Sequence, residues 1–159
     1  MLTVRLITVG TLKETYWQEA VAEYKKRLGA FCRFEEINLK EARVPEGASP
    51  AQIRAALEQE GKLMQPYLTP RSYKIALCVE GKQMSSEALA AKLDEVSSAA
   101  SEVVLLIGSS YGLCPEIKAA CDMRLSLSEL TFPHQLARVV VYEVVYRCMN
   151  ILKGTKYHK

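Results

Sequence analysis

The stretch VVLLI at residues 103–107, followed at once by GSSYG at 108–112, decides the fold class of this chain. An uninterrupted apolar run of this length is typical of a strand that is buried on both faces of a parallel sheet. The loop after it is bracketed by Gly108 and Gly112, and glycine permits a positive φ and a close approach of backbone to a ligand. The pattern therefore predicts a buried parallel strand with a candidate ligand loop at its carboxyl end.

The segments on both sides of this strand alternate between strand and helix patterns. Apolar patterning predicts further strands over 3–9, 32–39, 73–79 and 123–127, with residues 80–82 closing the third of these. Helical spacing and start signals predict helices over 14–28, from 49 to about 65, from a cap at Ser86 through Val96, briefly from 115, and from 133 to about 152. Strands that alternate with helices predict a single α/β domain over residues 1–159, with a largely parallel sheet flanked by helices.

The composition indicates a globular cytoplasmic protein. Its 159 residues, 49% of them hydrophobic, suffice for one domain with its own core. Residues 1–10 lack the basic start and continuous apolar block of a secretory signal, and no apolar run reaches the ~20 residues of a membrane helix. The five cysteines have no zinc or redox spacing. We therefore expect reduced structural thiols, no bound metal and no membrane partner.

The charge of the chain is unevenly distributed. A net charge of +3 neither demands nor excludes a nucleic-acid partner. Residues 138–159 contain a single acid, Glu143. The same segment contains the cations Arg138, Arg147, Lys153, Lys156 and Lys159. This basic end suits an RNA contact, and it equally suits a solvated helix end whose cations stabilise the helix dipole.

Three loops are candidates for a ligand site. Ligands of open α/β sheets bind beyond the carboxyl ends of the strands, which selects the loops after Val79, Ile107 and Leu127. The loop at 108–112 matches neither a Walker loop nor a dinucleotide fingerprint, and a plain turn explains its glycines as well. The segment SLSELTFPH at 126–134 can offer backbone amides and carbonyls to a polar ligand, or it can simply lead the chain to Pro133 at the start of the last helix.

The two histidines, His134 and His158, are the candidate proton acceptors. Histidine is the residue type that titrates near neutral pH, but no triad or nucleophile elbow accompanies either one. The tail GTKYHK at 154–159 adds an aromatic ring and cations to His158, which suits base stacking and phosphate contacts. A frayed terminus is the alternative interpretation of the tail.

Four segments of the chain resemble one known family. They are VGTLK at 9–13, LIG at 106–108, LSLSELTFPHQLAR at 125–138 and YHK at 157–159. On these segments the full chain is similar to the RlmH group of the SPOUT methyltransferases, which methylate N3 of a pseudouridine in 23S ribosomal RNA. The chain departs from the family pattern at Ser109, where the family commonly has a second glycine.

The resemblance implies a SPOUT-type α/β knot, in which the C-terminal region forms a trefoil knot, although true knots are otherwise essentially absent from protein folds. It also implies that the knotted loops hold S-adenosylmethionine. Carried over by position, the cofactor-binding residues are Leu77, Gly108, Leu127, Ser128, Glu129, Leu130, Thr131 and Phe132. These residues belong to the three candidate loops selected above.

The resemblance further implies a homodimer that acts on the assembled ribosome, at a pseudouridine in helix 69, and not on DNA. Methyl transfer to N3 requires alignment and removal of a proton. We expect His158, or else His134, to accept that proton, with Tyr157 and Arg138 stacking on the base or orienting phosphate. The alternatives are a related SPOUT enzyme acting on another RNA position, such as a transfer RNA ribose, and a non-catalytic ribosome-binding factor, for which Ser109 is the only hint.

Overall fold

All five strands of the protein lie in one parallel sheet. The computed structural model describes residues 1–159, and its strands are β1 (Thr3–Val9), β2 (Arg33–Leu39), β3 (Ser72–Lys82), β4 (Glu102–Leu106) and β5 (Met123–Leu125). The strands pair in the order β2-β1-β4-β3-β5, and every pair is parallel. The predicted parallel α/β sheet is confirmed, and the apolar run that predicted it forms the central strand.

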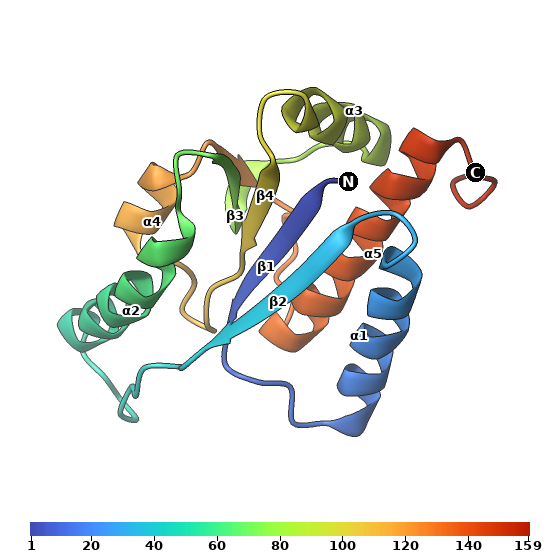
Figure 1. The fold of residues 1–159 in the computed structure, drawn as a ribbon. Helices are drawn as coiled ribbons and strands as arrows, with labels where there is room; N and C mark the ends of the chain where they lie inside the picture. Colours follow the sequence, from blue (N-terminus) through green and yellow to red (C-terminus); the bar gives the residue numbers. More distant parts are fainter.

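Helices cover both faces of this sheet (Figure 1). One face carries α1 (Thr15–Leu28), α3 (Ser86–Ser97) and α5 (His134–Lys153), and the other carries α2 (Pro50–Met64), the 3₁₀ turn η1 (Gln65–Tyr67) and α4 (Pro115–Ala120). Val103 and Leu105 of β4 pack into the core under α3 and α5, whereas Val104 and Leu106 pack into the core under α2 and α4. Because alternate side chains of a strand point to opposite faces, this double burial requires an apolar residue at every position of β4.

The helix starts follow their capping residues, with one correction. The predicted capping box of α2 is confirmed, because Ser49 Oγ accepts from the Gln52 N–H (3.2 Å) and the Gln52 side chain accepts from the Ser49 N–H (2.8 Å). The prediction that Ser86 caps α3 is wrong by one residue. Ser85 is the cap, since its Oγ accepts from the Ala88 N–H at 3.0 Å, and Ser86 is the first helical residue.

Strand β3 is longer than the sequence predicts. Residues 80–82 continue the strand instead of closing it, and Lys82 pairs with Leu125 after an irregularity in the register. A Cβ on Gly81 would lie 2.8 Å from the carbonyl carbon of Leu125 and 2.9 Å from that of Arg124. Gly81 therefore permits a close approach of two strands rather than a turn. Strand β5 is correspondingly short and ends at Leu125, two residues before its predicted end.

The parallel arrangement gathers the connecting loops at the carboxyl edge of the sheet. The segments that follow β1, β2, β4 and β5 all leave from this edge, whereas the two chain termini lie together at the opposite, amino edge (Figure 1). None of the helices combines the length and apolar character needed to cross a membrane. The carboxyl edge is thus the part of the molecule in which to look for a ligand site.

Candidate functional site

A pocket of about 100 Å³, here named the apolar pocket, lies at the carboxyl edge beside β3 and β4. Two of the three loops that the sequence selects reach this pocket, and its third wall is strand β3, which continues past Val79. The lining residues are Leu77, Cys78, Val79, Ile107, Leu127, Ser128, Leu130, Thr131, Phe132 and Ala137. Six of the eight residues proposed for cofactor binding are among them, and the other two, Gly108 and Glu129, directly adjoin lining residues in the chain. The fold therefore brings together the residues that the resemblance assigns to one ligand.

The loop after β4 has a shape that only glycine at position 108 allows. A Cβ on Gly108 would lie 2.1 Å from the carbonyl oxygen of Gly112, so no side chain fits there. The loop is closed by a hydrogen bond of 2.8 Å from the Gly112 N–H to the Ser109 carbonyl oxygen, and Gly112 itself has a φ of +88°. Ser109, the departure from the family pattern, is buried and does not line the apolar pocket. Its extra side chain is therefore accommodated without filling that pocket.

The segment from Leu127 to Phe132 presents most of its backbone to a ligand. Within it, the Leu130 N–H donates to Ser128 Oγ (3.0 Å) and the Ser128 carbonyl oxygen accepts from Ser126 Oγ (3.0 Å). The other backbone N–H and C=O groups of this segment make no hydrogen bond within the chain. Free backbone groups around apolar walls suit a ligand that combines a flat heterocycle with polar substituents.

Arg138, proposed from the sequence to contact RNA, is buried in the single chain. Its guanidinium donates to Glu36 Oε1 (3.3 Å) and to the Gly10 carbonyl oxygen (3.1 Å), and both charged side chains are almost fully buried. Tyr142 donates to the other oxygen of Glu36, and burial lowers the pKa of Arg138 and raises that of Tyr142. These contacts tie the start of α5 to the ends of β1 and β2. A direct contact of Arg138 with RNA would require the guanidinium to leave this network.

The two candidate proton acceptors lie at opposite edges of the sheet. His134 is the first residue of α5, two residues after Phe132 of the apolar pocket. The tail with Tyr157 and His158 follows the far end of α5, near the amino edge (Figure 1). Within one chain, the cofactor loops therefore meet His134 but not the tail. The structure contains no group of three or more His, Cys, Asp or Glu side chains that could hold a metal ion.

The tail is held against the last turns of α5 rather than left free. The Tyr157 hydroxyl donates to Glu143 Oε2 (2.7 Å), and the Arg147 guanidinium stacks over the Tyr157 ring at 4.6 Å from its centroid. His158 Nε2 lies 2.8 Å from Glu87 Oε1 at the start of α3. Burial alone would raise the pKa of Glu143, but hydrogen bonds from Tyr157, Tyr24 and Arg147 outweigh it and lower that pKa. The tail is thus a defined feature of the surface.

Glu60 of α2 is a buried acid that the sequence analysis did not single out. Only 3% of the residue is exposed, and its Oε2 accepts from the Ala42 N–H at 3.0 Å, while Oε1 has no hydrogen-bond partner. Burial raises the pKa of Glu60, although the Ala42 N–H and the nearby Ser109 hydroxyl partly offset this effect. Helical spacing could have found it, because Glu60 falls on the same stripe of α2 as Ala56 and Met64, which are both buried.

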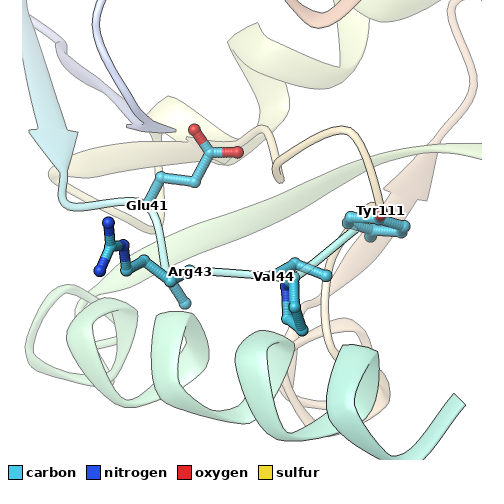
Figure 2. Close-up of a pocket in the computed structure, with 6 residues that line it drawn as sticks. Glu41, Arg43, Val44 and Tyr111 are labelled. Carbon is cyan, nitrogen blue, oxygen red and sulfur yellow. The ribbon is translucent and has the colours of Figure 1, made fainter. Parts of the chain in front are cut away.

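A second and larger hollow, here named the polar hollow, lies on the other side of the loop after β4. It has a volume of about 670 Å³, and Figure 2 shows Glu41 and Arg43 on one side of it and Tyr111 on the other. Ala42, Val44 and Pro45 complete its walls. None of the three loops selected from the sequence includes residues 41–45, which supply most of these walls. The loop at 108–112 therefore separates two hollows at the same edge.

The comparisons with known proteins agree with this geometry. The family model described as "Predicted SPOUT methyltransferase" matches residues 2–158. The chain, an α/β protein whose edge loops converge on one pocket, belongs to the SPOUT methyltransferase family. Among curated relatives, the protein named ribosomal RNA large subunit methyltransferase H of Streptococcus thermophilus (strain CNRZ 1066) is 43% identical over 159 residues, which are 99% of this chain and 100% of that protein.

Three further similarities extend this result. Proteins of the same name from Bifidobacterium adolescentis and Leuconostoc mesenteroides subsp. mesenteroides are 42% and 41% identical, with the same shares of both chains covered. A solved structure, that of a probable methylase family protein from Haemophilus influenzae Rd KW20, matches with a TM-score of 0.55 at 10% identity, covering 98% of this chain and 70% of that chain. This last similarity concerns the fold alone.

Proposed function

We propose that this chain methylates ribosomal RNA of the large subunit, with S-adenosylmethionine as the methyl donor and N3 of a pseudouridine in helix 69 of 23S RNA as the acceptor. The observation that carries the proposal is the apolar pocket, where β3, the loop after β4 and the segment after β5, all distant in sequence, meet at the carboxyl edge. Membership of a methyltransferase family and the names of the relatives support the reaction and the type of RNA. An enzyme with this substrate would act in the cytoplasm.

The residues of the apolar pocket fit this cofactor chemically. Apolar side chains such as Leu77, Ile107 and Leu127 suit the adenine ring, and the free backbone groups between Leu127 and Phe132 suit its polar atoms. The volume of about 100 Å³ is below the roughly 300–1,000 Å³ of sites for ligands of this size. We therefore expect residues 127–132 to move outward on binding, which the 72% exposure of Leu130 makes easy.

When bound, S-adenosylmethionine supplies an electrophilic methyl group, so that an N3–C bond forms while the S–C bond breaks and S-adenosylhomocysteine leaves. The protein has to align the base and take up the N3 proton. His158 is the preferred acceptor in this proposal, with His134 as the second candidate. Tyr157, which precedes His158 in the chain, would stack on the base.

The separation of the tail from the cofactor loops is the reason to include a homodimer in the proposal. His158 and Tyr157 lie near the amino edge, whereas the apolar pocket lies at the carboxyl edge (Figure 1). A two-fold axis that pairs chains in opposite orientation would bring the tail of one chain to the pocket of the other. The proposed active site is therefore composed of residues from both protomers.

The trefoil knot belongs to the same proposal. After β5 the chain passes the end of β3, where the Ser126 N–H donates to the Lys82 carbonyl oxygen at 3.0 Å, and then continues into the segment that lines the apolar pocket. A knot would fix this crossing, because the loops could not separate without unthreading the chain. A rigid crossing would keep Leu127 to Phe132 close to Gly108.

The proposal is tested by methyl transfer from labelled S-adenosylmethionine to purified ribosomes, with and without prior pseudouridylation, followed by mapping of the product by mass spectrometry. We expect label on N3 of a helix 69 pseudouridine. Label at another RNA position would favour a related enzyme with a different substrate. Binding to ribosomes without any transfer would favour a non-catalytic factor, and Ser109→Gly would then be the first variant to assay.

A further inference from the structure

The polar hollow contains three side chains that the fold leaves without partners. Glu41, Arg43 and Tyr111 make no hydrogen bond and no ion pair within the chain, and Tyr111 has no aromatic neighbour although its ring is half exposed. An acid, a cation and an aromatic ring that converge on one hollow without neutralising one another are typical of a surface that binds a polar ligand.

The position of the polar hollow links it to the apolar pocket. Gly108, in the loop after β4, adjoins Ile107 of the apolar pocket, and Tyr111 of the same loop lines the polar hollow. On the other side, Glu41 lies over the end of β1, since a Cβ on Gly10 would be 3.4 Å from Glu41 Oε2. The two hollows therefore flank a single loop at the carboxyl edge of neighbouring strands.

The walls of the polar hollow are fixed by the buried carboxyl of Glu60. Glu60 accepts a hydrogen bond from the Ala42 N–H, which belongs to one wall of the hollow. It also lies near the Ser109 hydroxyl, at the base of the loop that carries Tyr111 in the opposite wall. Burying a carboxyl with one unpartnered oxygen lowers the stability of the fold, so we look for a role of this contact that offsets the loss. Holding residues 41–45 at a set distance from Tyr111 is such a role, because a preformed site loses less entropy on binding.

We infer that the polar hollow binds an unpaired nucleotide of the RNA substrate next to the nucleotide that is methylated, an inference that rests on the proposed function. The Tyr111 ring stacks on the base, as aromatic side chains do with splayed single-stranded bases. The Arg43 guanidinium binds the adjoining phosphate, and the Glu41 carboxylate accepts from the donor edge of the base. Guanine is the best fit, since its N1–H and N2–H₂ point the same way and can donate to one carboxylate. The volume of about 670 Å³ accommodates one nucleotide.

The test compares ribosome affinity and methyl transfer for Tyr111→Ala and Tyr111→Phe, with cofactor affinity measured by calorimetry on the same samples. Loss of one stacked base predicts that Tyr111→Ala weakens ribosome binding by about 5- to 100-fold, whereas Tyr111→Phe stays within about twofold of the unaltered protein. Cofactor affinity is expected to be unchanged in both variants, because Tyr111 does not line the apolar pocket. Thermal unfolding verifies that the exposed substitutions leave the fold intact.

Arg43 and Glu41 provide two independent readouts. Arg43→Ala should lower the slope of log affinity against log salt by about 0.7–0.9, while Arg71→Ala, which removes an exposed cation at the amino edge, should not. With hexauridylate and a hexamer carrying one central guanosine as probes, the unaltered protein should prefer the guanosine-containing strand. Glu41→Gln should abolish that preference.

The outcomes separate this inference from the proposed function. If the unaltered protein methylates ribosomes but Tyr111→Ala binds them equally well, the nucleotide site is refuted and the proposed function stands. Equal losses for Tyr111→Phe and Tyr111→Ala would refute stacking. If the unaltered protein neither binds nor methylates ribosomal RNA, both proposals fall together.

Discussion

At the scale of single residues, the site depends on places where a side chain is excluded or buried at a cost. Gly108 cannot carry a side chain, because the loop after β4 folds back onto it at van der Waals distance. Glu60 and Arg138 place ionisable groups in the interior, where burial of a charge requires specific partners. These residues shape the site although none of them needs to touch a substrate.

Replacing Gly108 by alanine should damage catalysis more than stability. The new Cβ would lie 2.1 Å from the Gly112 carbonyl oxygen, so the loop must shift by about 1 Å or more. We expect kcat/KM to fall by about 100-fold and the free energy of unfolding to fall by about 1–3 kcal/mol. Activity assays measure the change in kcat/KM, and urea unfolding measures the change in the free energy of unfolding. Gly29→Ala is the control, because a Cβ there meets only ordinary contacts at 3.5 Å, and an equal loss in that variant would contradict the steric argument.

Glu60 should make the protein less stable as the pH rises. Because burial raises its pKa in the folded state, the folded protein holds this proton more tightly than the unfolded chain. Stability is therefore lost between the ordinary pKa of 4.5 and the raised value, and it stays lower above that window. Glu60→Gln should remove this loss. The melting temperature of this variant, relative to that of the unaltered protein, should therefore increase as the pH rises from 4 to 8. Glu58→Gln, at an exposed position of the same helix, should show no such gain.

At the scale of elements, two serines illustrate how a helix start is selected. Ser85 has the extended backbone of a cap, with φ −70° and ψ 160°, and Ser86 is already helical. The sequence predicted Ser86 as the cap, and the cap lies one residue earlier, three residues after the end of β3 at Lys82.

The two serines of α3 should therefore respond differently to replacement by alanine. Ser85→Ala removes the acceptor of the Ala88 N–H and should lower the free energy of unfolding by about 1 kcal/mol. Ser86→Ala should change it by less than about 0.5 kcal/mol. Chemical denaturation of the two variants side by side measures the difference, and the reverse order would contradict the assigned helix start.

At the scale of the whole molecule, the sheet separates two parts of the proposed active site. The cofactor loops gather at the carboxyl edge, because all five strands are parallel, while α5 carries the tail back toward the amino edge (Figure 1). The length of α5, from His134 to Lys153, is what keeps the two candidate histidines apart. In the proposed dimer, each chain therefore contributes its apolar pocket to one active site and its tail to the other.

Mixed dimers test this arrangement. Thr131→Trp fills the apolar pocket from an exposed position, and His158→Ala removes the proposed proton acceptor. Each variant alone should be inactive, but mixing equal amounts should restore about a quarter of the activity, since half of the dimers would hold one intact site of two. Methyl transfer after subunit exchange measures this value. An inactive mixture, with exchange verified by mass spectrometry, would indicate that each site is built from one chain.

The parallel α/β sheet, the succession of strands and helices along the chain and the resemblance to the family were all predictable from the sequence. Periodicity, caps and glycines act over a few residues, so β4, the capping box at Ser49 and the loop after β4 could be recognised without a structure. Three features required the three-dimensional structure: the serine that caps α3, the end of β3, and the burial of Arg138 against Gly10, 128 residues away in the chain. The contact between Glu60 and the Ala42 N–H, beside the polar hollow, likewise follows from the tertiary structure. These features depend on contacts between distant residues, which no local pattern encodes.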